Sequence, residues 1–332
     1  MQYDVGIRVD MGGKIGSGHF FRCLAIAKEL QKHKKRIIFL ITNKKNFLKH
    51  MNEKIEYIEL QKGTELKKIN ECKKLSNKIN LFIVDLPQHN ELYSKKLGLA
   101  VKKIIFDDIG NKEIECEMIV NGTLVKKFQK YTILNKKTKV CLGPKYAILR
   151  EQFYKNKKKF KISKKIKKVL ITFGGNDEND YSYKISKILI QKDFQITVVL
   201  GPTYKNYKKI LEFSKKYKNL KIKQNVKNIS KLFLSQDLVI CSVGITVYEL
   251  SCIGIPFIMI PDTNLQNIMA NEIQKKGIGK NFGYITKKLN DLESNLVQLD
   301  SFEIRNEMSI KSKKIIDGKG TLRITKNLLK II

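Results

Sequence analysis

Three consecutive stretches near the start of the chain decide the fold: Val5–Val9 (VGIRV), Asp10–His19 (DMGGKIGSGH) and Phe20–Leu30 (FFRCLAIAKEL). The first is a short apolar run that favours a β-strand. The second is a glycine-rich loop, and the third has the apolar spacing of an amphipathic helix. A strand, a loop and a helix in this order begin a parallel α/β sheet, in which ligands bind beyond the carboxyl ends of the strands.

The same alternation continues along the chain and then restarts. Short aliphatic runs are separated by lysine-rich stretches of helical length, which indicates parallel sheets covered by helices on both faces. We predict an N-terminal domain over 1–153, a lysine-rich linker over 154–168 and a C-terminal domain over 169–332. The expected strands are Val5–Val9, Ile37–Ile41, Leu81–Asp85, Ile104–Asp108 and Met118–Asn121, then Val169–Phe173, Ile196–Leu200, Leu238–Cys241 and Pro256–Ile260.

The last stretch, from about Ser301 to Ile332, is expected to form one or two helices. A final helix that returns to pack on the first domain is an open alternative.

Composition narrows the class of protein. Of the 332 residues 42% are hydrophobic, which is typical of a globular chain. No apolar stretch reaches the roughly 18 residues that cross a bilayer, and the first residues lack the pattern of a signal peptide. We therefore expect a cytoplasmic protein without membrane insertion. The six cysteines are singly spaced, which indicates buried thiols and neither a metal site nor a cofactor.

The formal net charge of +35 comes almost wholly from lysine. Proteins that read nucleic acid commonly use arginine forks, and this chain has arginine only at positions 8, 22, 36, 150, 305 and 323. We therefore predict a solvated basic surface that attracts anionic substrates, without specific nucleic-acid binding.

The loop from Gly12 to His19 is the first candidate for chemistry. Gly16 and Gly18, on either side of Ser17, permit a close approach of the backbone to a ligand, and the following helix start offers free N–H groups to an anion. His19 begins that helix, where the positive end of the dipole favours the neutral imidazole of a general base. Alternatively, His19 merely caps the helix or packs at its start.

Two loops of the second domain are further candidates. Gly174 and Gly175 follow a predicted strand and form a turn. After the strand that ends near Cys241, Gly244 and Thr246 would bind a diphosphate and Glu249 would accept two ribose hydroxyls. The spacing Thr246-x-x-Glu249 fits a helix capping box equally well.

Carboxylates also end several predicted strands. Asp85, Asp107 and Asp108 stand where a sugar would be positioned, and Asp107 and Asp108 equally fit caps of the next turn. Asp10 stands in the same kind of place.

Five segments in order now support a resemblance: 16–23 (GSGHFFRC), 106–108 (FDD), 142–153 (LGPKYAILREQF), 173–177 (FGGND) and 242–249 (SVGITVYE). Together they resemble the UDP-2,4-diacetamido-2,4,6-trideoxy-β-L-altropyranose hydrolase family of pseudaminic acid synthesis. That family includes spore-coat polysaccharide proteins and shares the GT-B fold of the MurG glycosyltransferase. The resemblance implies two Rossmann-like parallel-sheet domains that face a cleft, with UDP bound by the second domain.

The resemblance also implies a reaction and a set of site residues. It implies metal-free hydrolysis at the anomeric carbon with inversion, UDP as leaving group, His19 as base and Arg150 neutralising the diphosphate. It favours nucleotide binding over the pure capping box for Glu249. The implied substrate-binding residues are Gly16, Ser17, Gly18, Arg150, Gly174, Gly175, Asn176, Gly244, Ile245, Thr246, Glu249, Gln266 and Asn267.

The chain departs from the family pattern at three places. Ile245 stands where glycine is usual and Val247 where threonine or serine is common, and only Gln266 of an Asn-Gln pair is kept, with Asn267 beside it. Two other functions remain open. One is a glycosyltransferase on the same fold, for which Phe20, Phe21 and the lysines offer an apolar and basic patch. The other is an anion- or nucleic-acid-binding protein without catalysis.

Overall fold

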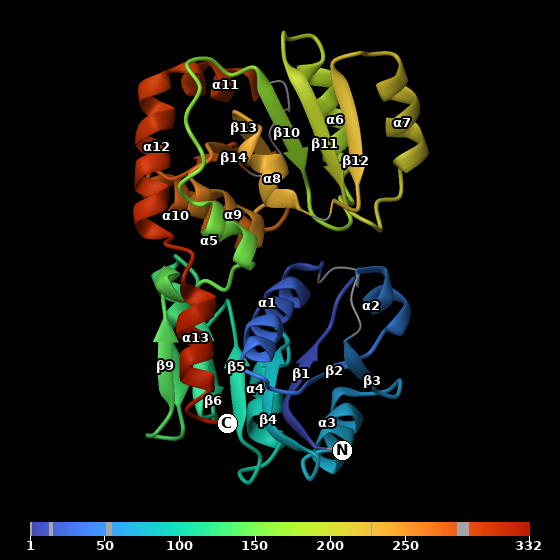
Figure 1. The fold of residues 1–332 in the computed structure, drawn as a ribbon, viewed down its shortest axis with the longest axis vertical. Coiled ribbons are helices and arrows are strands. Elements are labelled where there is room, and N and C mark those ends of the chain that lie inside the picture. The colour runs from blue at the N-terminus through green and yellow to red at the C-terminus, as the bar shows by residue number, and fades with distance from the viewer. Residues whose placement is uncertain (1, 13–15, 51–54, 227, 284–291) are drawn as a thin grey trace. The chain divides into compact units, whose positions relative to one another are not determined.

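The computed structural model describes residues 2–12, 16–50, 55–226, 228–283 and 292–332. It divides into two compact units. Unit 1 comprises Met1–Arg150 and Lys319–Ile332, and unit 2 comprises Glu151–Gly318 (Figure 1).

Unit 1 is built on a parallel sheet of seven strands in the order β3-β2-β1-β4-β5-β7-β9. The central strands are almost wholly buried, which explains their continuous apolar runs. A small parallel sheet pairs β6 (Lys112–Ile114) with β8 (Tyr131–Ile133). The seven strands are β1 (Tyr3–Val9), β2 (Ile37–Ile41), β3 (Glu56–Glu59), β4 (Ile79–Asp85), β5 (Lys103–Phe106), β7 (Met118–Asn121) and β9 (Lys139–Leu142).

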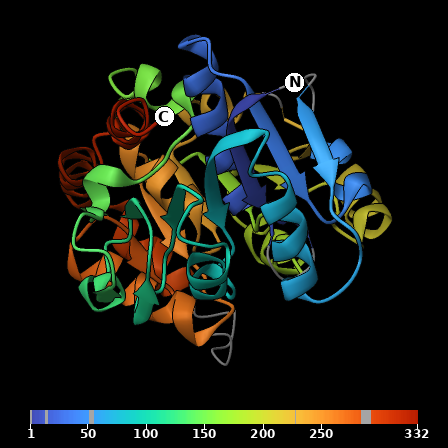
Figure 2. The same cartoon turned by 90° about the horizontal axis from the view of Figure 1, so that it is seen from below.

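Helices cover both faces of this sheet. In Figure 2, α1 (Gly18–Lys32, blue) and α13 (Gly320–Leu328, red) lie on one side, and α3 (Glu65–Lys74) and α4 (Asn90–Lys96), both cyan, lie on the other. A short α2 (Lys44–His50) adds Phe47 to the core beneath α1. The register pairs Val9 with Asp85, so that β1 and β4 end side by side.

Unit 2 repeats the architecture with a parallel sheet in the order β12-β11-β10-β13-β14-β15. Its strands are β10 (Lys168–Thr172), β11 (Gln195–Leu200), β12 (Leu220–Gln224), β13 (Leu238–Cys241), β14 (Phe257–Met259) and β15 (Lys280–Asn281). Its helices are α5 (Glu151–Asn156), α6 (Tyr181–Leu189), α7 (Tyr207–Lys215), α8 (Ile229–Leu234), α9 (Ile245–Ile253), α10 (Asn264–Lys275), α11 (Leu292–Asp300) and α12 (Phe302–Ile315).

The division of the chain differs from the predicted one at two places. Residues 319–332 belong to unit 1, because Ile324 and Leu328 of α13 pack into its core and Thr321 exchanges hydrogen bonds of 3.1 and 2.7 Å with the backbone of Leu149. The segment predicted as a linker, 154–168, lies within unit 2, where Phe160 and Ile166 are buried. Because lysines surround Phe160 and Ile166 in the sequence, the pattern of this segment did not indicate that these two side chains are buried.

Candidate active site

The carboxyl ends of β1 and β4 bring His19 to Asp85. His19 is the second residue of α1, which starts after the loop that follows β1, and Asp85 is the last residue of β4. Ser17 is the N-cap of α1 and no side chain caps this helix start, so the capping role considered for His19 is not observed. Gly16 has a positive φ of 69°, and residues 13–15 of the same loop lie outside the described part.

The contact between His19 and Asp85 assigns the tautomer of the imidazole. His19 Nδ1 lies 2.8 Å from Asp85 Oδ1. Arg22 Nη2 also lies 3.0 Å from Nδ1, but its N–H groups donate to Asp85 at the shorter distance of 2.6 Å. A carboxylate only accepts, so the contact with Asp85 assigns the proton to Nδ1, which leaves Nε2 with its lone pair. No partner of Nε2 occurs among the described residues, and the side chain is 18% exposed. A histidine held in this way has the proton-accepting atom of a general base directed away from its carboxylate.

Arg22 completes a network that sequence reasoning did not identify. Its guanidinium donates to both oxygens of Asp85, each at 2.6 Å, and to both oxygens of Asp108, at 2.7 and 2.8 Å. Burial by itself would raise the pKa of the Asp85 carboxyl, but the charge of Arg22 and the hydrogen bonds from Arg22 and His19 outweigh it and hold that pKa well below its usual range. Arg22 follows His19 by three residues on α1, a spacing that places both side chains on one face of the helix. This spacing is the sequence signal by which Arg22 could have been identified.

Asp107 and Asp10 have structural partners. Asp107 is buried and accepts from the backbone N–H of Ile109 (3.1 Å) and Gly110 (2.7 Å), so it caps the next turn, one of the two predicted roles. Asp10 accepts two bonds of 2.6 and 2.8 Å from Arg8, and one of 2.6 Å from Thr42. Of the four strand-end carboxylates of unit 1, only Asp85 therefore contacts His19.

Arg150 ends the main segment of unit 1. Its guanidinium lies 5.2 Å from the centre of the Phe21 ring, within cation–π distance. Since Phe21 belongs to α1, this contact places Arg150 beside the helix that carries His19.

In unit 2 the first glycine turn follows β10. Gly174 has a φ of 72°, and a Cβ placed there would meet no atom within 4 Å. The Gly175 carbonyl accepts two hydrogen bonds from Thr203, one from the hydroxyl at 2.7 Å and one from the backbone N–H at 3.2 Å, which anchors the turn. The Asn176 amide donates to Glu178 at 2.8 Å. The turn thus combines a fixed backbone with open space at Gly174.

The second glycine turn follows β13. Gly244 is the N-cap of α9, no side chain caps this helix, and a Cβ on Gly244 would also meet nothing within 4 Å. The capping-box alternative is therefore wrong, because Ile245 and Thr246 are already inside the helix. Glu249 lies one turn further on and is buried, at 2% exposed. A helix start with no acidic side chain in its first turn is suited to an anion.

Gln266 and Asn267 lie in the first turn of α10. The Gln266 side-chain oxygen accepts from the backbone N–H of Asp262 at 2.8 Å, and the backbone N–H of Gln266 donates to the Thr263 hydroxyl at 3.2 Å. Asn267 accepts from the Asn281 amide at 3.3 Å. The Gln266 side chain therefore fixes the loop that precedes α10, and the Asn267 side chain joins α10 to β15.

The described residues contain no group of three or more His, Cys, Asp or Glu side chains that could hold a metal ion. All six cysteines are buried thiols, and burial raises the pKa of Cys72 and of Cys116 to about 12. No helix in the described part of the chain has the length and apolar content needed to span a membrane.

Comparisons with known proteins agree with this architecture. The family model described as the glycosyltransferase family 28 C-terminal domain matches residues 145–322, more than half of the chain. MurG of Acinetobacter baumannii has the same fold, with a TM-score of 0.69 at 17% identity over 98% of this chain and 99% of that one. Anabaena HepE, solved with UDP-glucose, gives a TM-score of 0.60 at 12% identity over 99% of both chains. The predicted GT-B fold with two Rossmann-like domains is confirmed.

Relatives found by sequence similarity narrow the family further than the shared fold does. An uncharacterised protein of Methanocaldococcus jannaschii is 31% identical over 82% of this chain. The matched region covers 58% of the length of that relative. The spore coat polysaccharide biosynthesis protein SpsG of Bacillus subtilis is 24% identical over 97% of this chain and 96% of its own length. The UDP-2,4-diacetamido-2,4,6-trideoxy-β-L-altropyranose hydrolase of Campylobacter jejuni is 28% identical over 83% of this chain and 98% of its own. These similarities confirm the family resemblance of the sequence motifs, and the chain belongs to the glycosyltransferase family 28 C-terminal domain family.

Proposed function

We propose that this chain hydrolyses a UDP-linked 2,4-diacetamido-2,4,6-trideoxy sugar at its anomeric carbon and releases UDP and the free sugar for nonulosonic (pseudaminic) acid synthesis. The hydrolase of Campylobacter jejuni, similar to this chain over nearly its whole length, supports the substrate class. The observation that carries the proposal is the His19–Asp85 pair, which supplies a base at the end of a strand.

In the proposed reaction His19 Nε2 takes a proton from water while the water oxygen attacks the anomeric carbon. The bond from that carbon to the UDP oxygen breaks on the opposite side, and UDP leaves with the bonding electrons. Asp85 holds the imidazole and stabilises the imidazolium that forms. Attack opposite to the leaving group inverts the anomeric configuration.

Unit 2 would bind the nucleotide. The uncapped start of α9 offers N–H groups to the diphosphate, and the open space at Gly244 lets it approach the backbone. Glu249 would accept the ribose hydroxyls, and Arg150 would neutralise charge that develops on the leaving group. The remaining proposed contacts come from Gly16, Ser17, Gly18, Gly174, Gly175, Asn176, Ile245, Thr246, Gln266 and Asn267.

The direct test is incubation of the protein with UDP-linked deoxy amino sugars in the absence of any acceptor. We expect UDP to be released, and we expect the rate of release to be unchanged when a metal chelator is added, since no step of the proposed reaction uses a metal. Failure to release UDP from any of these sugars would remove the hydrolase proposal.

A paired substitution tests the base. His19→Asn should slow turnover roughly 10² to 10⁴-fold and leave UDP binding nearly unchanged. His33→Asn, at the exposed C-terminal end of the same helix, is the matched control and should have the wild-type rate. A near-wild-type rate for His19→Asn would exclude His19 from the mechanism.

A second candidate is a glycosyltransferase that uses a UDP-sugar donor for surface polysaccharide synthesis. The family model and the fold shared with MurG favour it. It requires that UDP release depend on an added acceptor, whereas the hydrolase releases UDP with water alone.

A further inference from the structure

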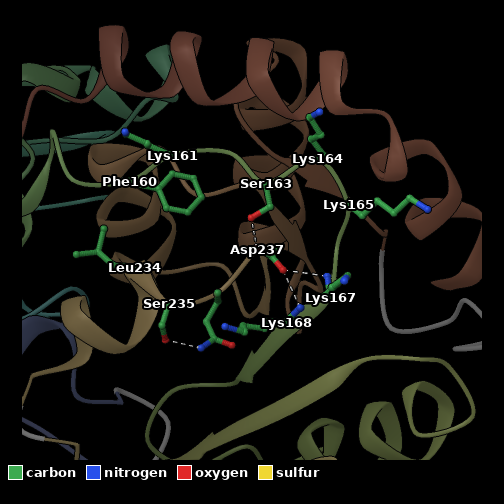
Figure 3. A pocket seen from close by; sticks show the side chains of 11 residues that line it. Phe160, Lys161, Ser163, Lys164, Lys165, Lys167, Lys168, Leu234, Ser235 and Asp237 are labelled. Carbon is green, nitrogen blue, oxygen red and sulfur yellow. Dashed lines mark hydrogen bonds between the residues drawn. The ribbon is translucent and has the colours of Figure 1, made fainter.

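Unit 2 contains a cavity of about 630 Å³ at the end of its sheet opposite to the glycine turns (Figure 3). Lys168 begins β10 and Asp237 immediately precedes β13, and both line the cavity. Gly174 and Gly244 follow the other ends of the same two strands. At about 3.3 Å per residue, the five residues of β10 separate the two ends by roughly 15 Å. The cavity is therefore distinct from the proposed nucleotide loops.

Five lysines line this cavity, and their charges are not balanced locally. Within the described residues, none of the five ammonium groups has a carboxylate within 4.0 Å. The one carboxylate, Asp237, accepts from the Ser163 hydroxyl at 2.5 Å and from the backbone N–H of Lys167 (2.9 Å) and Lys168 (2.8 Å). It therefore fixes the backbone of the loop, and the exposed ammonium groups stay available. The five are Lys161, Lys164, Lys165, Lys167 and Lys168.

A buried arginine fixes the same loop from α12. Arg305 is 0% exposed, and its guanidinium donates to the carbonyls of Ser163 (2.8 Å) and Lys164 (2.9 Å). Its Nε has no hydrogen-bond partner in the described part of the chain. Arg305 thus anchors the lysine loop and adds a positive charge beneath it, so that the loop presents its cations from a fixed backbone.

The two sides of the cavity differ in character. Figure 3 shows Phe160 and Leu234 on one side of Asp237, together with Lys161, and shows Lys164, Lys165 and Lys167 on the other. The volume is typical of sites for small molecules. Lysine provides point charges without the planar fork that selects single carboxylates, so a ligand with several closely spaced charges fits best. We propose that this cavity binds a compact oligophosphate.

The test is calorimetric titration of the full chain with sodium tripolyphosphate at fixed ionic strength and with UDP in excess, which occupies the proposed nucleotide loops. The cavity variant Lys164→Gln, Lys165→Gln, Lys167→Gln should bind about tenfold more weakly than the wild type, as expected for three lost surface charge interactions. The matched control Lys215→Gln, Lys216→Gln, Lys218→Gln removes the same charge from exposed positions at the end of α7 and should change the affinity less than about twofold.

Equal weakening in both triple variants would overturn the proposal, because the overall charge of +35 would then explain the binding. Loss of tripolyphosphate binding as UDP is added would also overturn it, by assigning the anion to the nucleotide loops. A third contrary result is an RNA oligonucleotide that binds through these lysines while tripolyphosphate does not. The comparison between the two triple variants holds even if the chain binds no UDP, so the two proposals fail separately.

Discussion

The strand ends of unit 1 hold carboxylates beside arginines, whereas those of unit 2 hold glycine turns and carboxylates that lack such partners. Asp85 lies against Arg22, and Asp10 against Arg8, and these arginines hold the pKa of each carboxyl below its usual range although burial opposes it. In unit 2, burial raises the pKa of Asp177 and of Asp262. Asp177 accepts from the backbone N–H groups of Tyr181 and Ser182 at the start of α6, at 2.9 and 2.8 Å.

This difference shows how one architecture supports two tasks. A network of charges fixes one side chain, His19, in one tautomer, which is what proton transfer requires. Glycine turns with open space leave backbone N–H groups accessible, which is what binding a diphosphate requires. In the proposed function, the same strand-end position would hold the reactive side chain in unit 1 and a backbone anion site in unit 2.

The largest expected effect comes from breaking the network of unit 1. Asp85→Asn should lower the free energy of unfolding by about 3–5 kcal/mol, because Arg22 loses a buried partner. Urea unfolding measures this change. The control Glu91→Gln breaks the exposed Glu91–Lys95 pair on α4 and should cost less than about 0.5 kcal/mol. An equal loss of unfolding free energy in the two variants would show that the buried network contributes no more stability than an exposed ion pair.

The corresponding change in unit 2 should act on ligand binding. Gly244→Ala has an ordinary extended φ of −165° and open space around the new methyl, so the free energy of unfolding should stay within about 0.5 kcal/mol. UDP affinity should fall about tenfold, because the methyl occupies the proposed path of the diphosphate to the helix start. Titration with UDP measures it, and an unchanged affinity would contradict the assignment of this turn.

Gly174→Ala sharpens the contrast between the two glycine turns. The space around Gly174 is as open as the space around Gly244, but a φ of 72° is unfavourable for alanine. We therefore expect the free energy of unfolding to fall by about 1 kcal/mol. The measurement is urea unfolding of this variant beside Gly244→Ala. If both variants were equally stable, the left-handed backbone at Gly174 would not constrain the residue.

The smallest effect is a pH dependence of opposite sign in the two units. Carboxyls with a lowered pKa, such as Asp85 and Asp10, stabilise unit 1 above the unfolded pKa near 4, and this stability is lost as pH falls through the folded pKa. Carboxyls with a raised pKa, Asp177 and Asp262, give stability that is present at low pH and lost as pH rises through the folded pKa.

Hydrogen exchange resolved by residue measures this dependence. From pH 7 towards pH 4 we expect protection, corrected for intrinsic exchange, to rise around α6 and to stay constant around β4. Below pH 4 we expect protection around β4 to fall. Parallel changes in both places would contradict the distinction.

Edge strands explain most of what sequence patterns missed in the fold. The predicted strands correspond to the inner strands of both sheets, because strands buried on both faces need continuous apolar runs. The missed members of the two large sheets are β3, β9, β12 and β15, which are their edges. Leu220–Gln224, for example, alternates apolar and polar side chains, since one of its faces is exposed.

Local spacing along the chain was sufficient to predict the parallel α/β class, the glycine turns after the strands and His19 at a helix start. The return of α13 to unit 1 and the place of Arg305 beneath the lysine loop became visible only in the folded chain. The tertiary structure also decided that Asp85, 66 residues from His19, is the partner that fixes its tautomer. The reason is physical: contacts between residues distant in sequence depend on strand order and register, which composition and periodicity do not contain.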